Sequence, residues 1–148
     1  MSRLDVLTKY ISMIQSDSFG EWIVDKENDG TPEHPIQMPF VGYSKMVDSF
    51  QEDLYKFCDE HPKYEHTRYG ETLDKNNIEW STESMQAADV SKLDEKCVIA
   101  LLIGAVRAER FCDGALLGFF NSGFILRWLD RLKEIDEGGE LNGEQETK

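Results

Sequence analysis

The stretch that decides the fold is Cys97-Val-Ile-Ala-Leu-Leu-Ile-Gly-Ala-Val106, which is the longest apolar run in the chain. A helix that crosses a membrane needs about 20 apolar residues, and this run has ten. The run therefore predicts a helix buried in a protein core, and no membrane segment. We expect this helix to extend from about Lys92 to Phe111, with Ser91-Lys-Leu-Asp94 resembling a capping box at its start.

Helical periodicity marks segments on both sides of this run. Apolar residues recur at spacings of three and four, which indicates amphipathic helices. Such helices are predicted over Ser2–Gln15, Tyr43–Glu60, Ser81–Ala88, Ala115–Asn121 and Phe124–Asp136. The sequence therefore predicts a mainly α fold, a single compact domain of four to six helices with at most a small β element.

Three other segments carry no helical pattern. Phe19 to Val24 is aromatic and β-branched, which favours one strand or a packed arm. Asp25 to Pro39 contains Asn28-Asp29-Gly30 and three prolines, so we expect a long surface loop. Lys63 to Trp80 is polar with interleaved aromatic residues, and a short hairpin is predicted there.

The two ends of the chain have different compositions. Gly138-Gly139 is expected to end the last helix, so residues 1–136 are predicted to form the helical domain. Residues 137–148 contain one apolar residue, which predicts a disordered acidic tail. Met1 to Asp5 has no apolar signal segment. We therefore expect a cytoplasmic protein.

The charge balance excludes one class of partner. The chain of 148 residues has 29 acidic and 16 basic side chains, giving a formal net charge of −13. Such a protein is not expected to bind nucleic acid non-specifically, because that requires cationic side chains. The three cysteines are widely spaced and odd in number, which argues against a disulfide framework.

Glu109 is the residue of greatest interest on the central helix. Val98, Leu101, Leu102 and Ala105 define the buried row of this helix, and Glu109 continues that row. A carboxylate at a core-facing position needs a partner. We expect Glu109 to be buried and paired with an arginine, Arg110 being the nearest candidate.

Two interpretations of this corner remain open. One is an ion-pair network that holds two helices together. The other is a pocket for an anion or small ligand, in which arginines bind near the Asp113-Gly114 helix start. The candidate residues are Arg107, Glu109, Arg110, Asp113, Arg127 and Arg131.

Metal and catalytic signatures are weak. Cys58, His61 and His66 lie within nine residues, but the paired cysteines of a strong zinc motif are absent. No nucleophile motif or phosphate-binding loop is present. The sequence therefore predicts no metal, no cofactor and no catalytic residue.

The C-terminal half resembles a known type of protein. Ile78-Glu-Trp80, Met85-Gln-Ala-Ala-Asp89 and Arg107-Ala-Glu-Arg-Phe-Cys-Asp-Gly114 are similar to segments of a family of small, mostly bacterial proteins of unknown function. That family has an Arg-Phe-x-acid-Gly corner between two helices. The resemblance covers about residues 78–136 and implies that the corner is a hallmark of the family. It implies no activity, cofactor or partner.

Three function classes follow from these patterns. A protein-interaction or regulatory module is the leading hypothesis, with a protein as the expected partner. A small-ligand binder or enzyme that uses residues 107–114 is the first alternative. An acidic nucleic-acid mimic or inhibitor is the second, since acidic side chains are spread over much of the chain.

Overall fold

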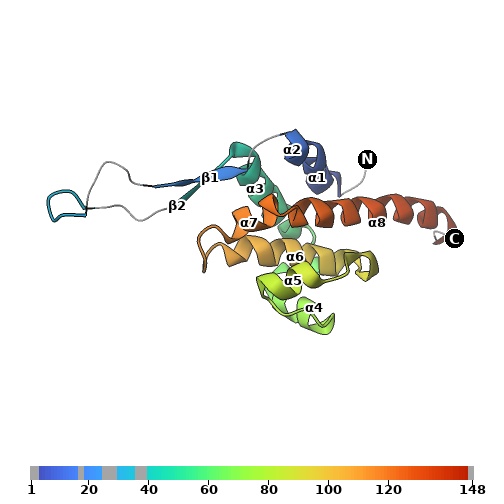
Figure 1. Ribbon diagram of the computed structural model, residues 1–148. Helices are drawn as coiled ribbons and strands as arrows, with labels where there is room; N and C mark the ends of the chain where they lie inside the picture. Colours follow the sequence, from blue (N-terminus) through green and yellow to red (C-terminus); the bar gives the residue numbers. More distant parts are fainter. Residues whose placement is uncertain (1–3, 17–18, 25–29, 36–39, 147–148) are drawn as a thin grey trace.

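A helical body carries a two-stranded arm that extends from one side (Figure 1). The computed structural model describes residues 4–16, 19–24, 30–35 and 40–146. The body is mainly helical, and its buried apolar side chains form a hydrophobic core that contains residues from helices along the whole chain. The prediction of a mainly α, single compact domain with a small β element is therefore confirmed.

Helix α6, Glu95–Ala108, lies at the centre of the body. Every residue from Cys97 to Val106 is buried, as expected for a helix that has neighbours on all sides. Helix α4, Tyr69–Lys75, packs on one side of α6, and helix α8, Phe124–Glu146, packs on another (Figure 1). The apolar run of the sequence is thus the core helix that was predicted.

The start of α6 differs from its prediction by one turn. The Asp94 side chain caps the helix by accepting the backbone N–H of Cys97 at 2.9 Å. Ser91 belongs to the preceding 3-10 turn, Val90–Lys92, where its hydroxyl donates to Asp89. The helix begins after Asp94 because an aspartate oxygen satisfies an amide that has no partner within the helix. At the other end α6 stops at Ala108, three residues before the predicted Phe111.

The remaining helices enclose this centre. Helix α3 caps on Ser44, whose side chain accepts the Val47 N–H, so Tyr43 lies outside the helix predicted to start there. The first predicted helix is interrupted at Lys9 and forms two short segments. The bounds are α1, Asp5–Thr8; α2, Tyr10–Ser16; α3, Lys45–Glu60; α5, Thr82–Ala87; and α7, Ala115–Asn121.

The prediction of a short hairpin before Trp80 is wrong. The expected hairpin of residues 63–80 is replaced by the 3-10 turns Pro62–Tyr64 and His66–Arg68 followed by α4. Thr72 and Leu73 are buried there on one helical face, which a strand would have split between two faces.

The last helix is longer than predicted. It continues to Glu146 instead of ending near Asp136, so the expected boundary of the acidic tail does not coincide with a helix end. Glycine disfavours a helix but retains its N–H, so Gly138 does not stop the helix as proline would. Residues 147 and 148 lie outside the described residues.

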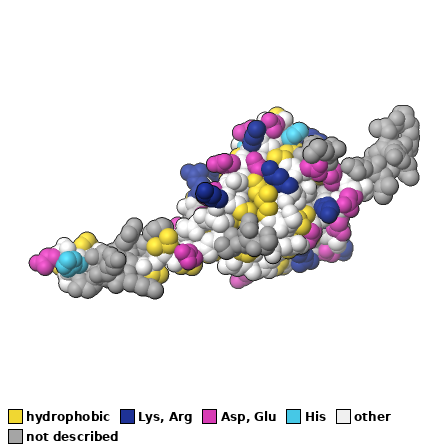
Figure 2. Space-filling model, turned by 90° about the horizontal axis from the view of Figure 1, so that it is seen from above, with side chains coloured by type: hydrophobic (Ala, Val, Ile, Leu, Met, Phe, Trp, Pro, Cys, Tyr) yellow, Lys and Arg dark blue, Asp and Glu magenta, His cyan; other side chains and the backbone are white. Residues whose placement is uncertain are grey.

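The arm consists of β1, Gly20–Ile23, and β2, Phe40–Tyr43, paired antiparallel with Gly20 opposite Tyr43. The predicted strand at Phe19–Val24 is confirmed as β1, whereas β2 was not predicted. Gly20 is required by close approach, because a Cβ there would lie 2.6 Å from the Gly42 carbonyl oxygen. Of the predicted loop, residues 30–35 are described and exposed, with Thr31 bridged to His34. Seen from above, the arm projects well beyond the body, and the part of the arm close to the body carries hydrophobic side chains (Figure 2).

No helix among the described residues combines the length and the apolarity that a membrane crossing requires.

Candidate functional site

The carboxylate of Glu109 is bound by the start of α7 and by the arm. Its Oε1 accepts the Tyr43 hydroxyl at 2.7 Å and the backbone N–H groups of Gly114 at 3.0 Å and Leu116 at 3.1 Å. The Tyr43 hydroxyl in turn accepts the N–H of Leu117 at 3.0 Å. These amides are the donors that the first turn of a helix leaves unpaired. Glu109 is therefore half-buried and satisfied as a capping group for α7.

The arginine partner expected for Glu109 is wrong. Among the ion pairs of the described residues none involves Glu109, and Arg110 is exposed. Gly114, the N-cap residue of α7, follows Glu109 by only five residues, so the free amides at the start of α7 bind the carboxylate in place of a guanidinium. The need for a partner was predicted from the sequence, but the partners are the Tyr43 hydroxyl and backbone amides.

Trp22 of the arm packs on the same corner. A Cβ at Gly114 would lie only 2.3 Å from Cζ2 of Trp22, and Gly114 has φ +89°. Both the backbone conformation and the indole ring thus require glycine at this position. Phe19, at the base of β1, stacks on Phe120 of α7 with ring centroids 5.1 Å apart. The corner formed by residues 109–114 therefore joins the arm to α6 and α7.

Two of the other predicted site residues lie at the opposite end of α6. Arg131 donates from Nε and Nη2 to the carbonyl of Leu93, at 3.2 and 3.0 Å, and pairs with Glu134 at 3.8 Å. Arg127 is exposed and contributes to the lowered pKa of Asp89, whose main cause is the hydrogen bonds from Ser91. Leu93 and Asp89 both precede α6, at the end opposite to the corner, so Arg127 and Arg131 are not part of the corner.

Arg107 lies at the corner end of α6 but faces the opposite way from Glu109. The hydroxyls of Tyr55 and Tyr69 interact with its guanidinium and raise its pKa. Its Nε atom is buried without a hydrogen-bond partner among the described residues. Asp113 is exposed and adds to the raised pKa of Tyr43, which burial and the hydrogen bond to Glu109 dominate. The six predicted residues are thus distributed over separate surroundings and do not form one pocket.

Sequence reasoning missed the apolar character of this region. Five large hydrophobic residues are exposed here, and we call them together the exposed apolar surface: Trp22, Ile23, Val24, Trp80 and Phe111. Trp80 donates its Nε1–H to the Gly104 carbonyl at 3.0 Å, and its ring meets Phe111 edge-on at 5.6 Å. Phe111 is 75% exposed. It lies beyond the end of α6 at Ala108, so the helical period of α6 does not predict its exposure.

A cavity of about 250 Å³ opens beside Trp80 and Phe111. We call it the Trp80–Phe111 cavity. Its lining is mostly apolar and comes from the start of α5, the end of α6 and α7. The lining residues are Trp80, Ser81, Thr82, Met85, Ala108, Phe111, Cys112, Ala115 and Phe119.

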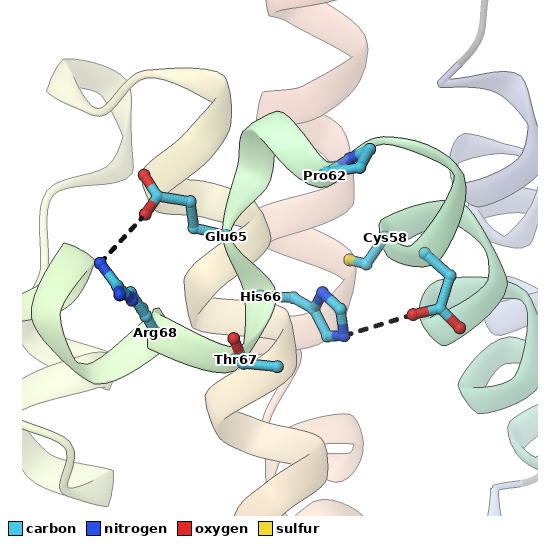
Figure 3. A pocket seen from close by; sticks show the side chains of 7 residues that line it. Cys58, Pro62, Glu65, His66, Thr67 and Arg68 are labelled. Atoms are coloured by element: carbon cyan, nitrogen blue, oxygen red, sulfur yellow. Dashed lines mark ion pairs between the residues drawn. The ribbon is translucent and has the colours of Figure 1, made fainter.

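Of the three residues considered for zinc, Cys58 and His66 line a second cavity and His61 does not. This cavity, of about 290 Å³, is lined by Cys58 and His66, and the His66 ring faces Asp59 at 3.5 Å (Figure 3). His61 packs its ring on Phe57 instead, with centroids 4.6 Å apart, and does not line the cavity.

The chemistry of this second cavity also disfavours a metal. Burial raises the pKa of the Cys58 thiol to about 12, which opposes the thiolate that a metal needs. Within the described ranges, no group of three or more His, Cys, Asp or Glu side chains is arranged to hold a metal ion. The absence of zinc from the purified protein stays a prediction.

Comparisons with known proteins place the chain in a family. No curated protein and no solved structure matches it. A family model described as a family of unknown function, DUF6508, matches residues 1–138. The match includes the N-terminal half and is therefore wider than the resemblance over residues 78–136. The chain belongs to this family of unknown function, DUF6508.

Proposed function

We propose that this protein is a protein-interaction module that binds its partner through the exposed apolar surface. One observation carries the proposal. Six large hydrophobic side chains are exposed among the described residues. Three of them, Trp22 to Val24, are consecutive in the arm, and the rings of two others, Trp80 and Phe111, are in contact on the body. Single exposed apolar residues are ordinary, whereas a group of them at one place indicates contact with another molecule.

The residue types and their positions support this function. Two of the five are tryptophans and one is a phenylalanine, and aromatic residues are enriched at protein interfaces. Trp22 packs on Gly114, and Phe111 belongs to the same turn, so the arm and the body contribute to adjacent parts of the surface. Both strands of the arm are also edge strands, so each has one side whose backbone N–H and C=O groups can pair with a strand of a partner.

The net charge indicates the character of the partner. At −13, the chain repels acidic proteins and attracts basic ones over about a Debye length, roughly 10 Å at 0.1 M salt. We therefore expect a basic protein whose association rate falls as salt is added.

The alternative of a ligand site or enzyme at residues 107–114 has less support. The Glu109 carboxylate is occupied by three donors, and two of the expected arginines lie at the far end of α6. Mimicry of nucleic acid remains a hypothesis based on charge alone.

Affinity capture with matched variants tests the proposal. The tagged protein and a Trp22→Ser/Phe111→Ser double variant are used to capture partners from the source cells at low salt, with quantitative mass spectrometry. Met13→Ser, which removes an exposed hydrophobic side chain elsewhere, is the control. We expect one or a few basic proteins to be lost from the double variant and retained by Met13→Ser. Capture of the same proteins in equal amounts by all three would contradict the proposal.

A further inference from the structure

The Trp80–Phe111 cavity has the size of a pocket for one side chain. Its volume of about 250 Å³ is below the 300–1,000 Å³ that is typical of pockets for drug-sized ligands. In protein interfaces, a single apolar anchor residue commonly fills a pocket of this kind and supplies much of the binding energy. The dimensions therefore fit part of a partner chain better than a free metabolite.

The cavity is held open by contacts within the protein. The Trp80 indole is fixed by its hydrogen bond to Gly104, and it lies so close to α6 that a Cβ at Gly104 would be 3.3 Å from Trp80 Cδ1. Met85, at 1% exposure, forms part of the floor. A preformed pocket binds more tightly than one that must be ordered on binding.

The charges beside the cavity are predominantly acidic. Trp80, Ser81 and Thr82 are flanked in the chain by Glu79 and Glu83, and Phe111-Cys112 is flanked by Arg110 and Asp113. All four of these charged side chains are exposed. Three carboxylates and one guanidinium thus directly precede or follow lining residues in the chain, and this excess of negative charge favours lysine or arginine on the occupant.

The other two described cavities lack this combination. The cavity near Cys58 is lined by Asp59, Glu65, His66 and Arg68, and has no apolar wall apart from Pro62 and the Cys58 thiol. A third, of about 370 Å³, is lined by polar residues such as Asn76 and Lys92 and by apolar residues such as Ile78 and Leu93 in about equal measure. Neither contains an exposed aromatic side chain.

We propose that the Trp80–Phe111 cavity receives one large apolar side chain of a partner peptide that carries lysine or arginine next to it. This inference rests on the proposed function and names the partner's chemistry at one point of the exposed apolar surface. Phe111 lies at the rim and packs against the bound side chain, while Glu83 and Asp113 attract the neighbouring basic residues.

Cys112 makes a direct test possible, because it lines the cavity and is exposed. Cys58 and Cys97 are buried, and burial raises their thiol pKa to about 12 and about 11, so neither competes at neutral pH. Short peptides with an N-terminal cysteine can therefore be captured on Cys112 as disulfides under exchange conditions. Three peptides are compared: Cys-Gly-Phe-Lys-Arg, Cys-Gly-Ser-Lys-Arg and Cys-Gly-Phe-Glu-Glu.

We expect the Phe-Lys-Arg peptide to be captured roughly tenfold more than either of the others at equal concentration of reducing agent, which corresponds to about 1.4 kcal/mol. Glu83→Lys should remove most of the preference for the basic peptide. Glu71→Lys is the matched control, since Glu71 is also an exposed acidic residue in the first turn of a short helix. It should leave the preference unchanged.

Equal capture of the three peptides would overturn the proposal, and so would an equal effect of the two lysine variants. NMR titration with N-acetylated Phe-Lys-Arg peptide that lacks cysteine gives a second readout at the Trp80 indole N–H. An unshifted Trp80 signal at millimolar peptide would likewise count against the cavity. If these tests fail while partner capture still depends on Trp22 and Phe111, only the anchor pocket is wrong. If that dependence is also absent, the interaction function itself is wrong.

Discussion

The central helix and the arm place the same kinds of residue in opposite surroundings. From Cys97 to Val106 the hydrophobic side chains of α6 are at most 5% exposed, whereas Trp22, Ile23 and Val24 are 49%, 41% and 51% exposed. Isoleucine and valine occur in both segments. Burial is therefore decided by the number of neighbouring elements, and the arm has only one strand beside each of its strands.

The arm depends on the body for its stability. An isolated two-stranded hairpin is at best marginally stable in water. Here its base is held by Tyr43, which bonds Glu109, and by Trp22, which lies on Gly114. Beyond this base, Ile23 and Val24 are exposed and lie outside the hydrophobic core.

The largest difference between the two regions should appear on truncation of an aliphatic side chain. Leu101→Ala in α6 should lower the free energy of unfolding by about 2–5 kcal/mol, because it removes buried methyl groups and leaves a cavity. Ile23→Ala on the arm should cost no more than about 1 kcal/mol, since its side chain is already exposed. Urea denaturation of both variants measures the contrast. Equal losses would show that the arm is as much a part of the folding unit as α6 is.

The contact between arm and body can be broken at Gly114. Gly114→Ala should destabilise the protein by about 2–4 kcal/mol, because alanine is strained at φ +89° and its Cβ meets the Trp22 ring. Adding Trp22→Ala should recover the steric part of this loss and leave the backbone strain.

Gly118→Ala is the control for that experiment. No atom lies within 4 Å of a Cβ at Gly118, which is in α7 and has no positive φ. Alanine there should be neutral or stabilise by about 0.5–1 kcal/mol. A loss at Gly118 equal to that at Gly114 would argue against the Trp22 contact.

The carboxylate at the junction should matter more than the adjacent arginine. Glu109→Ala removes the acceptor for three donors and should cost about 1–3 kcal/mol, measured by thermal or chemical denaturation. Arg110→Ala should change stability by no more than about 0.5 kcal/mol, because Arg110 is exposed. A larger loss of stability for Arg110→Ala than for Glu109→Ala would support the Glu109–Arg110 ion pair that was first expected.

The smallest expected effect is a loss of folding stability in alkali, caused by ionisation of Tyr10 and Tyr43, and it is absent at neutral pH. Tyr10 in the body donates to Asp53, and Tyr43 at the junction donates to Glu109. Burial, followed by the hydrogen bond to each carboxylate, raises the pKa of both phenols above the ordinary value near 10. Because the pKa is raised in the folded state, the stability that each protonated phenol contributes is complete below pH 10 and is lost as the pH rises beyond it.

Denaturation midpoints recorded from about pH 8 to pH 11.5 measure this decline. Tyr10→Phe and Tyr43→Phe should each make the decline above pH 10 shallower, and the double variant should make it shallowest. An unchanged slope in the double variant would show that neither phenol is responsible.

Local pattern was sufficient for the elements that are stabilised by their own periodicity or caps. The short helix Ala115–Asn121 lies where the sequence predicted it, and the helix predicted over Ser81–Ala88 is Thr82–Ala87, capped by the Ser81 side chain. Apolar spacing and serine capping act within a few residues. The hairpin expected before Trp80 was wrong, since its aromatic residues belong to a helical face and to the exposed surface. The N-terminal strand was predicted without its partner, because strand pairing joins residues about 20 positions apart.

The candidate site shows the same limit. The position of Glu109 on the buried row predicted that its carboxylate needs a partner, and this is a property of helix geometry alone. The identity of the partner, namely Tyr43 and the first amides of α7, required the fold. Arg131 could not be assigned either, because its bond to Leu93 joins two segments 38 residues apart.

The sequence by itself determined a mainly helical acidic domain with the Cys97–Val106 helix at its centre, because helical period, capping residues and net charge are all local or additive properties. Only the tertiary structure decided that Trp22, Trp80 and Phe111 are exposed, that the Trp80 and Phe111 rings meet, and that a cavity opens beside them and Cys112. Solvent exposure depends on what remains uncovered after every element has packed, and no local pattern contains that information.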